Sequence, residues 1–164
     1  MSLTTAQIQE AFDAKGLSPF FTPQSLSALA GFTEKMLLIN RTLNLTRWTE
    51  DEQFLHFHLL DSALAIPLIK PLLGASTPPR WLDLGTGCGF PGSVLMAAFP
   101  EAQITLLDSV GKKITALEDC MQVSGLKGLT LVGRVEEGGQ DPRYREQFDG
   151  VVARAVDDFP VVLE

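Results

Sequence analysis

A glycine-rich turn constrains the fold of this chain more than any other segment. Residues 83–92 read Asp-Leu-Gly-Thr-Gly-Cys-Gly-Phe-Pro-Gly and continue the apolar run 81–84. Closely spaced glycines let a backbone turn sharply and approach a ligand where any Cβ would collide. A helix that begins at such a turn offers free N–H groups and the positive end of its dipole to an anion. The segment therefore predicts a strand, a tight turn and a helix that together cradle a ligand.

The chain after residues 77–79, Thr-Pro-Pro, alternates short apolar runs with helical segments. We expect strands at 81–84, 104–107, 129–132 and 150–153, and helices at 92–99, 112–123 and from Asp157 onward. Strands separated by helices favour crossover connections and a parallel sheet with helices on both faces. The expected fold class is therefore α/β and Rossmann-like.

The preceding segment has a helical pattern and no strand signal. Thr22 followed by Pro23 indicates a helix start. Apolar positions then recur at steps of three and four residues, which predicts one buried stripe of Leu26, Leu29, Ala30, Phe32, Thr33, Met36 and Leu37.

A second helix is expected from His58 to about Leu73, with Asp61 on its polar side and Pro67 as a kink or break. We divide the chain into a helical segment at 1–76, packed on the core, and a ligand-binding domain at 77–164. A chain of 164 residues is long enough for one core.

Composition and charge limit the partners. Thirteen Lys and Arg against twenty Asp and Glu give a net charge of −7, so contact with nucleic acid must rest on a local basic patch. Lys112, Lys113, Arg134 and Arg154 all lie near the carboxyl ends of expected strands, where open α/β sheets bind ligands. Scattered solvated charges are an equally good interpretation of these four residues.

Targeting and metal signals are absent from the sequence. The amino terminus has no basic stretch followed by an apolar run, and the longest apolar stretch, 63–69, is too short to span a bilayer. Cys88 and Cys120 form no CxxC pair, and His56 and His58 point to different sides of a helix. We therefore expect a cytoplasmic protein with no membrane segment and no metal.

The spacing of the turn leaves two ligands open. Gly87-x-Gly89-x-x-Gly92 satisfies the dinucleotide expression, and Asp108 stands about 20 residues further on, where an acid holds a ribose. NAD and S-adenosylmethionine both carry an adenosine ribose, so the spacing does not separate them. With the second ligand, the glycines would line the methionyl part and Asp83 would lie near its amino group. A tight turn without a ligand needs neither three glycines nor the acid.

A series of motifs follows the order in which one family carries them: Asn44-Leu-Thr46, His58-Leu-Leu-Asp61-Ser62, the turn 82–92, Thr105-Leu-Leu-Asp-Ser109 with Lys112-Lys113, and Phe148-Asp-Gly-Val-Val-Ala-Arg-Ala155. From about Asn40 to Glu164 the chain resembles the bacterial 16S ribosomal RNA guanine-N7 methyltransferases, also called the glucose-inhibited division protein B family. The resemblance implies the methyltransferase form of the Rossmann-like fold, S-adenosylmethionine as the cofactor, and 16S ribosomal RNA or the small ribosomal subunit as the partner.

The resemblance also implies residue roles. Gly85, Phe90 and Arg154 would contact the cofactor, Val135 and Glu136 would flank its adenine, and Arg154 would be catalytic at the reaction centre. From the spacing of the turn and the acid we add Gly87, Gly89 and Asp108 as cofactor-binding residues. An arginine can donate to guanine O6 or pair with a phosphate. Its alternative is a surface ion pair with Asp157 or Asp158.

The chemistry matches the side chains that follow the fourth strand. Guanine N7 has a lone pair and no proton to lose, so its methylation needs alignment and no general base. The sequence places Arg154 after that strand and has no Asn-Pro-Pro-aromatic motif there. His58 and Asp61 are expected to form a hydrogen-bonded structural pair, with lining of the cofactor pocket as the alternative. Phe20, Phe21, Phe54 and Phe57 are expected in the core rather than as base-stacking platforms.

The end of the sequence bears on activity. Members of the family continue beyond the fourth strand, whereas this sequence ends at Glu164. We therefore expect the C-terminal strands to be missing and the exposed sheet edge to be able to pair with a second copy. The oligomeric state itself stays open. Three other functions also stay open: an NAD-dependent oxidoreductase, a cofactor-binding fragment without activity, and a methyltransferase for a small molecule.

Overall fold

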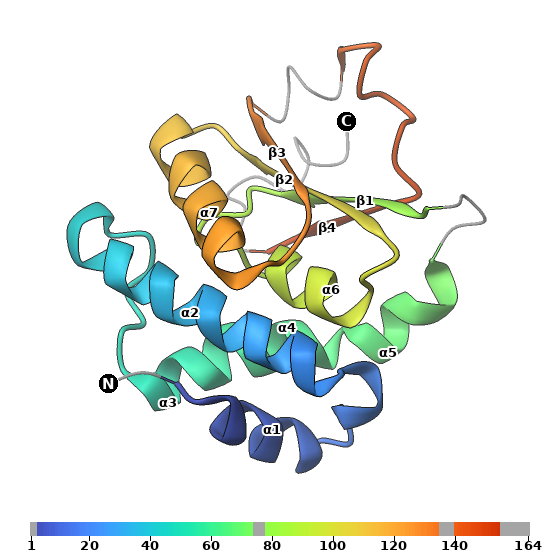
Figure 1. Cartoon of the computed structure of the whole chain (residues 1–164). Coiled ribbons are helices and arrows are strands. Elements are labelled where there is room, and N and C mark those ends of the chain that lie inside the picture. The colour runs from blue at the N-terminus through green and yellow to red at the C-terminus, as the bar shows by residue number, and fades with distance from the viewer. Residues whose placement is uncertain (1–2, 74–77, 135–139, 155–164) are drawn as a thin grey trace.

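The computed structural model describes residues 3–73, 78–134 and 140–154, and its centre is a parallel sheet (Figure 1). Four strands lie in the order β3-β2-β1-β4. They are β1 (Arg80–Leu84), β2 (Gln103–Asp108), β3 (Leu129–Val132) and β4 (Gly150–Ala153), and every pairing is parallel. The α/β, Rossmann-like prediction is confirmed, and each expected strand lies within one residue of its observed bounds.

Two helices connect the strands along one face of the sheet. Helix α6 (Gly92–Ala98) follows β1, and α7 (Gly111–Ser124) follows β2, both close to the expected ranges. The other face carries a small cluster of Leu82, Leu84 and Leu107, with Leu131 and Phe148 packed on it. The helix expected from Asp157 onward lies outside the described residues, so the covering of this face stays a prediction.

Helix α2 (Pro23–Leu43) starts as its sequence predicts. The Thr22 hydroxyl accepts from the Ser25 N–H at 3.1 Å, and the Ser25 hydroxyl accepts from the Thr22 N–H at 3.0 Å. This reciprocal cap satisfies N–H groups that the first turn leaves free. Of the expected stripe, Leu26, Leu29, Phe32, Thr33 and Met36 are buried, whereas Ala30 and Leu37 are half-buried.

The second long helical segment begins earlier than predicted. It starts at α3 (Asp51–Phe54) and continues through a π-helical stretch, η2 (Leu55–Leu60), into α4 (Asp61–Leu64). The expected start at His58 is wrong because the acidic residues of the first turn favour the positive end of a helix seven residues upstream. Pro67 breaks the segment as expected, since α4 ends before α5 (Ile66–Ile69) begins.

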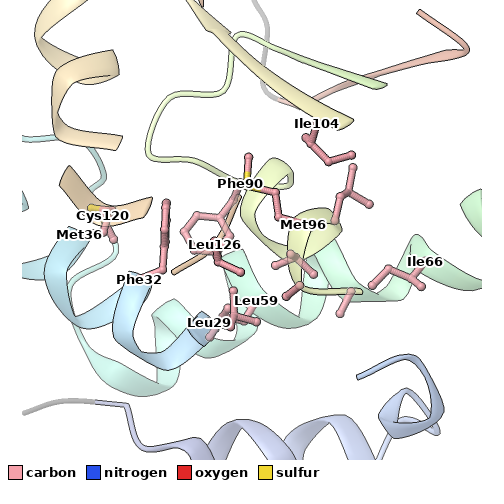
Figure 2. Close-up of a cluster of buried hydrophobic side chains, with 14 of the residues drawn as sticks. Leu29, Phe32, Met36, Leu59, Ile66, Phe90, Met96, Ile104, Cys120 and Leu126 are labelled. Atoms are coloured by element: carbon pink, nitrogen blue, oxygen red, sulfur yellow. The ribbon is translucent and has the colours of Figure 1, made fainter. Parts of the chain in front are cut away.

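The N-terminal helices and the sheet share one hydrophobic cluster (Figure 2). Phe32 and Met36 of α2 lie with Phe90 of the glycine turn and with Cys120 of α7, all fully or almost fully buried. The remaining short helical elements are α1 (Thr5–Asp13), η1 (Ser18–Phe20) and η3 (Lys70–Leu72). A boundary at 76–77 stays a prediction, and helices on both sides of it contribute to this core.

Two further expectations concern edges and membranes. In the described part of the chain, β4 pairs with β1 and has no partner strand on its other side, so pairing of a second copy there remains an expectation. Within the same residues, no helix combines the length and the apolar character needed to cross a bilayer.

Candidate functional site

The glycines of the turn divide into two kinds. Gly87 has a positive φ of 59°, and a Cβ built on it would come no closer than 3.9 Å to another residue, so the space beside it is open. Gly89 has a positive φ of 93°, but its Cβ would lie 2.7 Å from the Phe32 ring and 2.9 Å from a Leu117 methyl. Gly87 therefore leaves room for a ligand, whereas Gly89 lets the turn pack against α2 and α7.

The buried Asp83 carboxylate stabilises the turn through hydrogen bonds. One oxygen of its carboxylate accepts from the Thr86 hydroxyl at 2.6 Å and from the Gly92 N–H at 2.8 Å. Burial raises the pKa of Asp83 to about 6, although these two donors act in the opposite direction. Asp83 does not line the pocket that the turn forms, so the amino-group contact expected for it has no support here.

A pocket of about 490 Å³ opens at the carboxyl ends of the strands. Three parts of the chain line it: the helical segment through Leu45, Arg47, Trp48, Phe57, His58 and Asp61, the turn through Gly85, Thr86, Gly87, Cys88 and Phe90, and the sheet edge through Asp108, Lys113 and Arg154. The structure thus brings together five of the predicted site residues.

The remaining predicted residues lie elsewhere. Gly89 does not line the pocket, because it faces the core. Val135 and Glu136 lie outside the described residues. Of the expected basic patch, Lys113 and Arg154 line the pocket, whereas Lys112 and Arg134 are exposed and do not.

Asp108 joins the end of β2 to the glycine turn. One of its oxygens accepts from the Gly87 N–H at 3.1 Å, and the other accepts from the Val110 N–H at 2.9 Å. The Lys113 ammonium lies 3.6 Å away. A carboxylate has about four lone-pair sites, so Asp108 retains capacity to accept from ligand hydroxyls.

Arg154 is held by the helical segment. Its Nη1 donates to Asp61 at 2.9 Å and to the Phe57 carbonyl at 2.5 Å, and its Nη2 lies 2.7 Å from His58 Nδ1. Because a guanidinium only donates, His58 Nδ1 accepts and the imidazole carries its proton on Nε2. That N–H then donates to the Thr46 hydroxyl at 2.7 Å.

This network corrects one expectation and leaves another untested. His58 and Asp61 do not form the direct pair expected of them; in the described structure each bonds Arg154 instead. The Arg154 ion pair is with Asp61, and the alternative partners Asp157 and Asp158 lie outside the described residues. His58 and Asp61 do line the pocket, which was the alternative that the family resemblance offered for them.

The site contains no activated base or thiol among the described residues. Burial and, to a smaller extent, the Arg154 charge together lower the pKa of His58 to about 4, against the opposing effect of Asp61. Burial also raises the pKa of Cys88 to about 11, so its thiol stays protonated at neutral pH. Within the same residues, no cluster of His, Cys, Asp or Glu could hold a metal ion. The arrangement suits binding and alignment rather than proton abstraction.

The state of His58 can be tested by pH. Its pKa falls from 6.5 to about 4 on folding, so the unfolded chain takes up the proton first as the pH drops. We expect the protein to lose roughly 3 kcal/mol of unfolding free energy between pH 6.5 and 4 relative to a His58→Gln variant, whose amide oxygen can still accept from Arg154. Denaturant unfolding at each pH measures this difference. Asp83 titrates in the unmodified chain and in the variant alike, so its contribution cancels when the two unfolding free energies are subtracted. If the difference in unfolding free energy between the two proteins did not change with pH, the His58 imidazole would not be held neutral by the fold.

The fold and the pocket together define a class. A glycine turn after β1 and an acid at the end of β2, both at the carboxyl edge of a parallel sheet, are typical of Rossmann-like proteins that bind nucleotide cofactors. The family model described as rRNA small subunit methyltransferase G matches residues 25–164. The chain belongs to this family, which confirms the resemblance seen in its motifs.

Individual relatives agree with the family. The chain is 37% identical over 142 residues to a protein of Roseiflexus castenholzii, covering 86% of this chain and 58% of the relative. It is 46% identical over 127 residues to one of Synechococcus, covering 76% and 49%, and 34% identical over 163 residues to one of Leuconostoc mesenteroides, covering 99% and 66%. Each is named ribosomal RNA small subunit methyltransferase G. The chain thus spans about half to two thirds of the length of these relatives.

Sequence reasoning missed part of the pocket wall. Arg47 and Trp48 follow the motif Asn44-Leu-Thr46 directly, yet they were given no role. Phe57 was expected in the core and is 49% exposed, so that prediction is wrong, whereas Phe54 is fully buried as expected. An adjacent arginine and tryptophan in a loop between two helices was the available signal.

Proposed function

We propose that this chain is an S-adenosylmethionine-dependent methyltransferase that acts in the cytoplasm on N7 of a guanine in 16S ribosomal RNA. The observation that carries the proposal is that one pocket joins the glycine turn, Asp108 and Arg154. The names of the relatives support a ribosomal RNA substrate. The family membership supports a methyltransferase over an oxidoreductase.

The pocket residues fit the cofactor. The volume of the pocket, about 490 Å³, lies within the range of small-molecule sites. Gly85 and Gly87 would lie against the methionyl part, because the space beside Gly87 is open. Asp108 would accept from the ribose hydroxyls with its remaining lone pairs. Bound S-adenosylmethionine would supply a methyl group on a sulfonium, which a lone pair displaces in line.

Arg154 would orient the substrate base. A guanidinium has five N–H donors, and three of them bond Phe57, Asp61 and His58. Within the described residues, one N–H on Nη2 and the one on Nε have no protein acceptor and would donate to guanine O6 or to a phosphate. His58 holds this guanidinium through a nitrogen that cannot serve as a base at the same time. Guanine N7 loses no proton on methylation, so the site needs no general base.

Calorimetry separates this proposal from NAD binding. We expect S-adenosylhomocysteine to bind the chain and NADH not to bind. A Gly87→Ala variant should lose about tenfold or more in affinity, because its methyl group enters the open space of the pocket. Gly16 also has a positive φ, 68°, with no atom within 4 Å of an added Cβ, and it lies outside the pocket.

The Gly16→Ala variant is the matched control, because it introduces the same backbone strain without touching the ligand. It should bind S-adenosylhomocysteine as the unmodified chain does. Tight NADH binding with no S-adenosylhomocysteine signal would refute the proposal. Equal loss in both variants would show that Gly87 acts through folding alone.

Activity needs a second assay, since the chain covers only part of its relatives. Transfer of a labelled methyl group to 16S ribosomal RNA or to small subunits from cells lacking this modification is the expected result. Cofactor binding without transfer to either substrate would identify a binding module instead. Transfer to small molecules alone would contradict the RNA substrate.

A further inference from the structure

An exposed aromatic stack borders the pocket. The rings of Trp48 and Phe57 lie 4.3 Å apart between centroids, at 18° to one another, and the Arg47 guanidinium lies 4.6 Å from the Trp48 ring. All three residues line the pocket that contains the glycine turn. We call Arg47, Trp48 and Phe57 the rim stack.

Core packing does not explain the rim stack. Phe57 is 49% exposed, although its neighbours Phe54 and His58 are buried in the same helical segment. A half-exposed phenylalanine forgoes much of the free energy that its burial would supply. Aromatic surface at the mouth of a pocket is typical of a contact for a ligand.

Backbone hydrogen bonds place Trp48 and Phe57 beside Arg154. The backbone N–H of Trp48 donates to the Thr46 hydroxyl at 3.2 Å, and the same hydroxyl accepts from the His58 ring. The Phe57 carbonyl accepts from Arg154 at 2.5 Å. These hydrogen bonds are made by backbone atoms of Trp48 and Phe57, so they place the two residues beside the arginine, and the contact between the two rings holds the side chains against one another.

We propose that the rim stack is the subsite for the acceptor nucleotide, an unpaired purine nucleotide of an RNA strand, and this rests on the proposed function. Enzymes that modify a base take it out of its stack, and single-stranded RNA is recognised by stacking on aromatic rings and guanidinium planes. The rim supplies both surfaces next to the cradle for the methyl donor. Lys113 and Arg154 lie against the carboxylates of Asp108 and Asp61, so the third cation, Arg47, gives the pocket lining an excess of positive charge on a chain whose net charge is −7.

Intrinsic fluorescence provides the first test. The chain has two tryptophans, and Trp81 is only 4% exposed, so Trp48 is the one that a ligand in the pocket contacts. We expect a short single-stranded RNA with a central guanine to quench the emission of the full chain saturated with S-adenosylhomocysteine. The same RNA annealed to its complement should quench much less. Equal quenching by both forms, or none by either, would overturn the proposal.

Variants provide the second test, by anisotropy of the labelled RNA. Trp48→Leu and Phe57→Leu should each weaken single-stranded RNA binding about fivefold to a hundredfold and weaken S-adenosylhomocysteine binding much less. Tyr144→Leu is the matched control, because Arg143 lies 5.3 Å over the Tyr144 ring in a similar pair that does not line the pocket. It should bind RNA normally.

The outcomes separate this inference from the proposed function. If S-adenosylhomocysteine binds but the rim variants hold RNA as the unmodified chain does, the subsite is wrong and the cofactor site stands. If the Tyr144 variant loses as much affinity as the rim variants, the effect is not specific and the subsite is also wrong. If S-adenosylhomocysteine does not bind at all, the proposed function is wrong, and the subsite that rests on it is wrong as well.

Discussion

Replacing Arg154 with alanine should lower methyl transfer by roughly a hundredfold or more, while S-adenosylhomocysteine affinity changes by less than about threefold. Among the described residues, Arg154 uses three of its five N–H donors on Phe57, Asp61 and His58, and the proposed function assigns the other two to the substrate. Its removal takes away the orienting contact to the base and leaves the glycine turn and Asp108 in place. Single-turnover transfer and calorimetry on the same preparation measure the two effects.

Two controls accompany this variant. Arg143→Ala removes an exposed arginine that pairs with Asp141 outside the pocket and should change neither quantity. Arg154→Lys keeps the charge but lacks the planar fork of donors, so it should recover little of the transfer. Collapse of cofactor affinity in Arg154→Ala would show that the arginine serves the cofactor rather than the base.

Replacing Gly92 with alanine should destabilise the whole protein. A Cβ at Gly92 would overlap a methyl group of Leu106 and lie 2.7 Å from the Asp83 oxygen that accepts from the Gly92 N–H. Overpacking of this kind costs about 3 kcal/mol, which lowers the Tm by roughly 6–12 °C in a chain of this size. The cofactor pocket should be lost as well, because Asp83 braces the turn that forms it.

Gly31→Ala is the matched control for this substitution. Gly31 lies inside α2, and the nearest atom to an added Cβ would be Ser124 Cα, at an ordinary contact distance of 3.8 Å. Alanine in a helix interior is favoured over glycine by about 1 kcal/mol, so the Tm should rise by a few degrees. A Gly92→Ala variant with an unchanged Tm would contradict the close packing beneath the turn.

The strand, turn and α6 could be predicted because they are specified locally. The apolar run before Gly85 is too short for a helix, and the glycines that follow permit the positive φ angles that the turn requires. The cap at Thr22 is equally local, since its two hydrogen bonds join residues three positions apart. The meeting of Gly85, Asp108 and Arg154 followed from one rule, that parallel strands end at the same edge.

The missed features depend on contacts between distant segments. Gly89 was assigned to the ligand because spacing does not reveal the Phe32 ring beside it. His58 and Asp61 were paired with one another because their helical spacing permits it, whereas Arg154 is 96 positions from His58 in the chain. Phe57 was placed in the core because its hydrophobicity does not show that the π-helical register turns it outward.

In the proposed function, the turn at Gly85–Gly87 and the Asp108 carboxylate hold S-adenosylmethionine. A crystal structure of the chain with S-adenosylhomocysteine tests it most directly. We expect the amino-acid part of the ligand to lie against Gly85 and Gly87 and its ribose hydroxyls to lie within hydrogen-bond distance of Asp108. Ligand density elsewhere, with this pocket empty or filled by the chain's own side chains, would contradict it.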